Sequence, residues 1–148
     1  MKQRGLKFLS LLLMLVLLIG VLPGMSAWAY SPYGLSVGGV DVDDDHLSGE
    51  GWSYAPATNT LTLNGATIAV ASGNGIYSFS GQLNIVLSNN STNTVSSLNN
   101  TGINCQGKLS ISGGGSLTVS GSGGSSGIFC RGLNQRRQRG CFRHFQRN

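Results

Sequence analysis

Apolar and polar residues alternate in short segments through the middle of the chain, and these segments recur at a nearly constant spacing. Each recurrence begins with a glycine and an isoleucine, at Gly75-Ile76, Gly102-Ile103 and Gly127-Ile128, which lie 27 and 25 residues apart. The segments are too short to bury a hydrophobic face alone and no helical period separates them, whereas stacked coils build a continuous core. The pattern predicts an all-β fold in which residues 64–130 form a short right-handed parallel β-helix.

The period of two also predicts which side chains point into the coils and which point out. The isoleucines of the three recurrences form one inward column: Ile76, Ile103 and Ile128. The next position gives an outward column: Tyr77, Asn104 and Phe129. The position after that points inward again: Ser78, Cys105 and Cys130. Three further inward pairs follow from the same period: Leu83 with Leu109, Ile85 with Ile111, and Val95 with Val119.

Two hairpins precede the coils. The first turns at Gly38-Gly39, where both residues take a positive φ without strain. The second turns through Ala55–Asn59, where proline presets φ and asparagine tolerates the left-handed region. The four strands of these hairpins are Leu35–Val37, Val40–Val42, Trp52–Tyr54 and Leu61–Leu63. Residues 30–63 are therefore predicted to be a β-hairpin cap that covers the open edge of the first coil.

Residues 1–29 have the pattern of an export signal peptide, which is expected to be helical. A basic start is followed by an uncharged apolar run from Phe8 to Val21 and by the small-residue motif Ala27-Trp28-Ala29. Cleavage near Ala29 predicts a secreted or cell-surface protein that meets the membrane only through this segment. The alternative is an uncleaved membrane anchor, for which the apolar run is near the lower length limit.

The positive net charge of the chain, +5, comes from its two ends. All five acidic residues lie between Asp41 and Glu50, and Lys108 is the one basic residue of the coils. Residues 30–130 are therefore acidic overall, which argues against a nucleic-acid partner. Residues 131–148 carry six arginines and no alternating pattern. This tail is predicted to be disordered, either as a truncated or frame-shifted end or as a basic arm for anionic polymers or membranes.

Several segments of the chain resemble the opening of a bacterial protein family. They are Val37–Val40, Tyr54–Ile68, Gly75–Tyr77 and Leu83–Leu87. The family consists of repeat-bearing, exported β-helix proteins of Gram-positive anaerobes, which are described as carbohydrate-binding or surface proteins and are similar in fold to pectate lyases. The resemblance covers residues 33–129. It implies that this chain is an N-terminal fragment of a longer, exported protein whose partner is a polysaccharide or cell-wall glycan.

The same resemblance bears on the choice among three functions. Flat rings at Tyr77 and Phe129, roughly 10 Å apart with Asn104 between them, suit stacking on sugars, so these three residues are the candidate carbohydrate-binding site. A passive surface stalk or adhesin segment without a ligand is the alternative. Pectate lyases use a basic residue for proton abstraction and a carboxylate cluster for calcium, whereas these coils offer Lys108 and no acid. A polysaccharide lyase is therefore least favoured, and no enzyme activity is expected.

The remaining candidate chemistry concerns cysteines. Cys105 and Cys130 are predicted to stack in successive coils at a spacing of about 4.8 Å, which a disulfide accepts, and export permits oxidation. Two small buried thiols are the alternative, because stacked parallel side chains make poor disulfide geometry. Cys141 is left over in either case.

The acidic residues from Asp41 to Glu50 offer oxygen ligands for calcium. Their spacing lacks the glycine and the bidentate glutamate of a calcium loop, which favours a solvated turn. No catalytic residue, metal site or cofactor is predicted. Residues 75–129 make little more than two coils with no closing element, so the isolated chain is expected to be marginally stable or prone to aggregate, and otherwise to be a monomer.

Overall fold

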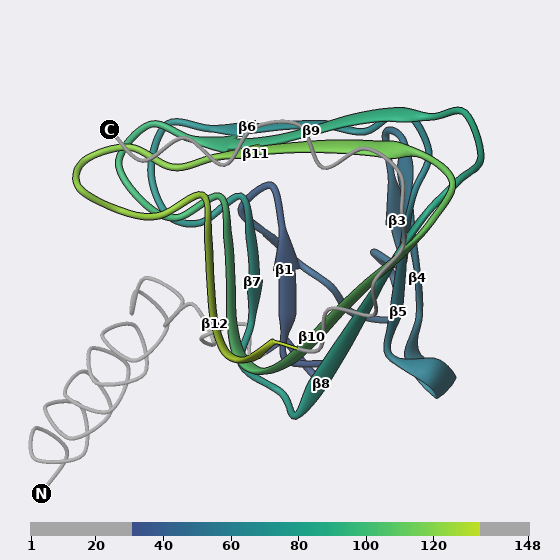
Figure 1. Ribbon diagram of the computed structural model, residues 1–148. Helices are drawn as coiled ribbons and strands as arrows, with labels where there is room; N and C mark the ends of the chain where they lie inside the picture. Colours follow the sequence, from purple (N-terminus) through teal and green to yellow (C-terminus); the bar gives the residue numbers. More distant parts are fainter. Residues whose placement is uncertain (1–30, 134–148) are drawn as a thin grey trace, which may run out of the picture.

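The computed structural model describes residues 31–133, which form an all-β fold of twelve strands and one short 3-10 helix. The predicted signal segment, residues 1–29, and residues 134–148 of the predicted tail lie outside the described residues. Figure 1 shows the strands along three sides of a triangle, with the chain passing repeatedly from one side to the next. We name these sides the first, second and third walls.

The first two walls belong to one curled nine-stranded sheet, and the third wall is a separate three-stranded sheet (Figure 1). The first wall contains β1 (Leu35–Val37), β2 (Val40–Asp41), β7 (Ile76–Ser78) and the first parts of β10 (Ile103–Gly113) and β12 (Ile128–Leu133). The second wall contains β3 (Ser48–Gly49), β4 (Trp52–Ala55), β5 (Thr60–Leu63), β8 (Gln82–Leu87) and the second part of β10. The third wall contains β6 (Thr67–Val70), β9 (Thr92–Ser97) and β11 (Ser116–Ser120).

We call one passage of the chain along the three walls a coil. The nine-stranded sheet is mixed, but the strands of β7 to β12 that lie on the same wall in successive coils pair in parallel, in the register that the sequence predicts. Ile103 lies opposite Ile76 on one side and Ile128 on the other. The other predicted pairs are also register partners: Leu83 with Leu109, Ile85 with Ile111, and Val95 with Val119. A shared register stacks like side chains on one another, which lets the coils bury one continuous apolar column at each position.

The core lies inside the triangle and consists of these columns. Eight of the inward side chains that the sequence predicts are at most 2% exposed: Ile76, Ile103, Ser78, Cys105, Leu83, Ile85, Leu109 and Val95. Each buried aliphatic side chain contributes roughly 1.5 to 3 kcal/mol. Partly buried partners pack against them at the C-terminal end of the stacked strands: Ile111, Val119, Ile128 and Cys130.

Both predicted hairpins are present and confirm the turn chemistry. Val37 lies opposite Val40, and Gly38 and Gly39 between them have φ values of 64° and 82°. In the second hairpin the 3-10 helix η1 (Pro56–Thr58) leads into Asn59, whose φ is 48°. β1 pairs antiparallel with β7, and β4 pairs antiparallel with β5. β5 also pairs in parallel with β8, so the predicted cap and the predicted coils share this strand.

A buried asparagine interrupts the apolar columns of the third wall. Asn93 is 0% exposed and is the register partner of Leu117. Its Oδ1 accepts hydrogen bonds from the backbone N–H groups of Gly65 and Ala66 at 2.9 and 3.0 Å. Its Nδ2 donates to the Ser116 carbonyl oxygen at 3.0 Å and to a serine hydroxyl at 2.9 Å. The side chain therefore joins the coil before its own to the coil after it.

The last strand extends beyond the boundary that composition suggests. The sequence places that boundary after residue 130, whereas β12 continues to Leu133. Gly132 lies opposite Lys108 and Leu133 lies opposite Leu109 on β10. Arg131 lies on β12 between Cys130 and Gly132, both of which pair with β10, at a shift in the register of the two strands. Between Ser31 and Leu133 no helix is long and apolar enough to cross a membrane.

Candidate functional site

The outer face of the first wall carries a row of side chains that combines polar groups with aromatic rings. Ser36 on β1 lies opposite Tyr77 on β7, Tyr77 lies opposite Asn104 on β10, and Asn104 lies opposite Phe129 on β12. Neighbouring strands are about 4.8 Å apart, so Tyr77 and Phe129 are separated by roughly 10 Å. The structure thus brings the three residues of the predicted carbohydrate site together. We call Tyr77, Asn104 and Phe129 the outer row.

Exposure along the outer row suits contact with a ligand. Phe129 is 47% exposed, and Tyr77 and Asn104 are half-buried. A second aromatic ring, Phe79, lies beside Tyr77 with ring centroids 5.8 Å apart and an angle of 37° between the planes. Phe79 is 39% exposed, so the two rings present a broader apolar surface than Tyr77 alone.

Phe79 belongs to a set of positions that the sequence argument did not reach. It lies four residues after Gly75, and the same offset in the later coils gives Gln106 and Arg131. Extending the alternation by one position beyond Ser78, Cys105 and Cys130 would have found this set. Asn104 accepts a hydrogen bond from Gln106 Nε2 at 2.9 Å, which joins the outer row to the corner between the first and second walls.

An open depression of about 580 Å³ lies at this corner. It is lined by two cations, two amides and three glycines: Lys108, Arg131, Gln82, Gln106, Gly81, Gly107 and Gly132. Gly107 allows the backbones of successive coils to approach closely where the chain bends. A Cβ atom on Gly107 would lie 1.7 Å from the Gly81 carbonyl oxygen, so this position requires glycine. The sequence did not predict the depression.

The amides of the depression are held by neighbours on their own strands. Gln82 Nε2 donates to Asn84 Oδ1 at 2.9 Å, as Gln106 Nε2 does to Asn104. Asn84 in turn donates to the Thr58 carbonyl oxygen at 3.0 Å. Each glutamine keeps its carbonyl oxygen and a second N–H for a ligand. The site therefore offers fixed hydrogen-bonding groups next to exposed rings.

Cys105 and Cys130 are register partners on β10 and β12, as the sequence predicts, and both carry free thiols in the structure. Cys105 is 0% exposed, and burial raises the pKa of its thiol. Cys130 is half-buried, and its thiol lies 3.3 Å from the Gly107 carbonyl oxygen and 3.2 Å from that of Gly132. Both thiols thus lie against backbone carbonyls of residues that line the depression. Cys141 is outside the described residues.

We expect iodoacetamide to modify Cys130 faster than Cys105 in the folded protein. The thiolate is the reactive form, and the raised pKa and full burial of Cys105 both reduce its reaction. Peptide mass spectrometry after timed alkylation measures the two rates, and unfolding should remove the difference. Protection of both cysteines until a reductant is added would instead show the disulfide that the sequence left open.

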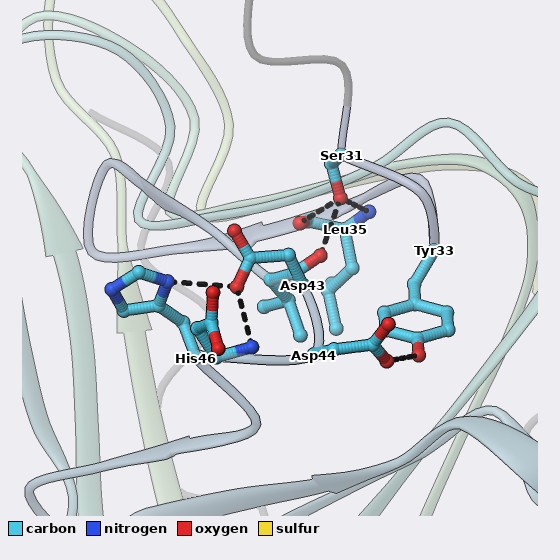
Figure 2. Close-up of polar contacts among 8 residues, drawn as sticks. Ser31, Tyr33, Leu35, Asp43, Asp44 and His46 are labelled. Atoms are coloured by element: carbon cyan, nitrogen blue, oxygen red, sulfur yellow. Dashed lines mark hydrogen bonds and ion pairs between the residues drawn. The ribbon is translucent and has the colours of Figure 1, made fainter.

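The acidic loop after β2 is organised by hydrogen bonds of its own (Figure 2). Asp43 Oδ1 accepts from the backbone N–H of Asp45 at 3.0 Å and lies 2.7 Å from His46 Nδ1. The hydrogen bond with His46 lowers the pKa of Asp43, and the hydrogen bond that Tyr33 donates to Asp44 raises the pKa of Tyr33. Residues 31–133 contain no group of three or more His, Cys, Asp or Glu side chains arranged to hold a metal ion.

The loop is tied to the hairpin by the buried hydroxyl of Ser31. Ser31 Oγ lies 2.8 Å from the Leu35 carbonyl oxygen and 2.9 Å from that of Val42, and it accepts from the Leu35 N–H at 3.1 Å (Figure 2). These contacts give the acidic loop a structural role.

The outer row with its adjoining depression is therefore the candidate functional site. No family model matches the chain, and no curated protein or solved structure matches it.

Proposed function

We propose that this protein is exported, that its signal segment is removed near Ala29, and that it binds carbohydrate outside the cell through the outer face of the first wall. We further propose that the coils are those of a right-handed parallel β-helix. The parallel register of β7, β10 and β12 supports a β-helix, in which successive coils stack in parallel and the same position of each coil lies on one continuous face. An exposed face whose residues occupy the same position in each coil suits a ligand that is itself a repeating polymer.

The observation that carries the proposal is the spacing of aromatic and amide groups in the outer row. Aromatic rings stack on the apolar faces of sugar rings, and amides bond their hydroxyl groups. Tyr77 and Phe129 stand in one register row with Asn104 between them, and the Asn104 carbonyl is already fixed by Gln106. The amide of Asn104 is therefore held in place before binding and has less conformational freedom to lose.

Two other functions are less well supported. A passive stalk would leave the outer row without a ligand, and the retention experiment below decides between binding and stalk. A polysaccharide lyase would need carboxylates near a base, whereas no carboxylate lines the described depression beside Lys108. We therefore propose binding without catalysis.

Replacing Tyr77 and Phe129 together by leucine should reduce retention on the insoluble polysaccharide that the unmodified protein binds by about tenfold or more. Leucine keeps much of the apolar volume but removes the flat π-face on which sugars stack. Pull-down on cellulose, chitin and peptidoglycan measures the retention, and far-UV circular dichroism checks the fold. Leu98→Ala is the matched control, because Leu98 is a 66% exposed apolar side chain outside the outer row. Unchanged retention in the double variant would exclude this site.

A further inference from the structure

The depression at the corner of the first and second walls has a positive charge that no described carboxylate balances. Lys108 and Arg131 line it, and both side chains are exposed. The acidic residues of the chain all lie between Asp41 and Glu50. In the part of the chain that the structure describes, the one ion pair joins His46 to Asp43, so Lys108 and Arg131 are both left for an external anion.

The backbone holds the lysine in a defined place. The Lys108 N–H donates to the Gly81 carbonyl oxygen at 2.7 Å, and Gln82 and Gly132 are the register partners of Lys108 on its two sides. A Cβ atom on Gly132 would lie 3.2 Å from Lys108 Cγ, so the bare glycine leaves room for the lysine stem. Lys108 is thus flanked by an amide on one side and open backbone on the other.

Arg131 reaches the same depression from the first wall. It precedes Gly132 on β12, and Gln106 on β10 lines the depression with it. A guanidinium group binds carboxylate or sulfate oxygens through two parallel hydrogen bonds, and a lysine ammonium adds a point charge. Glutamine N–H groups complete a set of donors with no competing acid among the lining residues.

We propose that this depression binds the anionic substituent, a carboxylate or a sulfate ester, of a glycan whose rings lie on the outer row. The inference rests on the proposed function and specifies its ligand as an acidic polysaccharide. A volume of about 580 Å³ falls in the range of small-ligand sites and accommodates a sugar residue with its substituent. The Gln106–Asn104 hydrogen bond of 2.9 Å makes the depression and the outer row continuous.

The test compares polymers that share a backbone and differ in charge. One pair is hydroxyethyl cellulose and carboxymethyl cellulose, and the other is dextran and dextran sulfate. Affinity electrophoresis of the full chain should show tighter binding to the charged member of at least one pair, and the two pairs distinguish a carboxylate from a sulfate ligand. Lys108→Gln and Arg131→Gln should each reduce that preference by about tenfold, because each removes a charge-assisted contact.

Arg143→Gln is the matched control, because it removes the same charge from the arginine-rich segment outside the described residues. The proposal is overturned if this variant loses as much preference as the other two, if Lys108→Gln and Arg131→Gln keep the preference, or if the unmodified chain binds no charged polymer. Failure of the outer row is seen separately, as unchanged retention of a neutral polysaccharide by the Tyr77→Leu/Phe129→Leu variant. Circular dichroism of each variant checks that the fold is intact.

Discussion

Replacing Asn93 by alanine should lower the free energy of unfolding by about 3–5 kcal/mol. The substitution leaves the N–H groups of Gly65 and Ala66 and the Ser116 carbonyl oxygen without their partner. The bond to the Ala66 N–H is buried, whereas the bonds to Gly65 and Ser116 are partly buried. A buried backbone group that loses its hydrogen bond costs about 1–3 kcal/mol, a partly buried one costs less, and water entering the vacated space offsets part of the total. Urea unfolding followed by circular dichroism measures the change.

Two further variants separate the effect of the lost hydrogen bonds on stability from the effect of the lost side-chain volume. Asn93→Leu should be about as damaging as Asn93→Ala, although Leu117 shows that the next coil accepts leucine in this column. Asn84→Ala should cost no more than about 1 kcal/mol, because Asn84 is half-buried on an outer face and its partners can bond water. If the Asn93→Leu variant were as stable as the unmodified protein, the hydrogen bonds of Asn93 would contribute nothing to the free energy of unfolding.

Gly107→Ala should destabilise the protein by about 3 kcal/mol or more. The new Cβ would lie 1.7 Å from the Gly81 carbonyl oxygen, and this oxygen is held by the Lys108 N–H at 2.7 Å. Overpacking usually costs about 1–3 kcal/mol, and here the obstacle is backbone that cannot rotate away, so the upper end applies. Thermal unfolding monitored by circular dichroism measures the loss.

Gly81→Ala is the matched control for that experiment. Nothing lies within 4 Å of a Cβ placed on Gly81, so this substitution should change stability by less than about 0.5 kcal/mol. The two glycines occupy the same corner in successive coils, and only one of them is closed to a side chain. Equal stability of the Gly107→Ala and Gly81→Ala variants would mean that the coils are spaced more widely at the corner than the structure shows.

The repeated Gly-Ile signals allowed the register of the coils to be predicted. Ile76, Ile103 and Ile128 stack because a period of two fixes which face each residue takes, and a one-residue slip would expose the whole column. The same logic placed Tyr77 and Phe129 in one outward row. The Gly38-Gly39 turn was predictable because few residue pairs accept two positive φ values.

Sequence reasoning failed where structure depends on contacts between coils and not on a local period. Asn93 lies in a polar stretch typical of turns, and its burial depends on Gly65 and Ala66, which are 27 or more residues away. The depression depends on where β10 bends, and alternation does not encode a bend. Arg131 was assigned to a tail because composition changes there, whereas backbone pairing with β10 continues to Leu133.

The antiparallel hairpins fix the direction in which strands can be added to the first and second walls. β1 occupies one edge of β7 and β4 occupies one edge of β5, so on these two walls further coils add only toward higher residue numbers. Each later strand then finds its parallel partner in the coil just completed, as Ile103 finds Ile76. In a chain that is synthesised from its N-terminus, each completed coil offers the exposed edges of its strands as pairing partners for the strands of the next coil. A defect in one coil therefore acts on the coils that contact it on both sides, as Asn93 contacts the coil before its own and the coil after it.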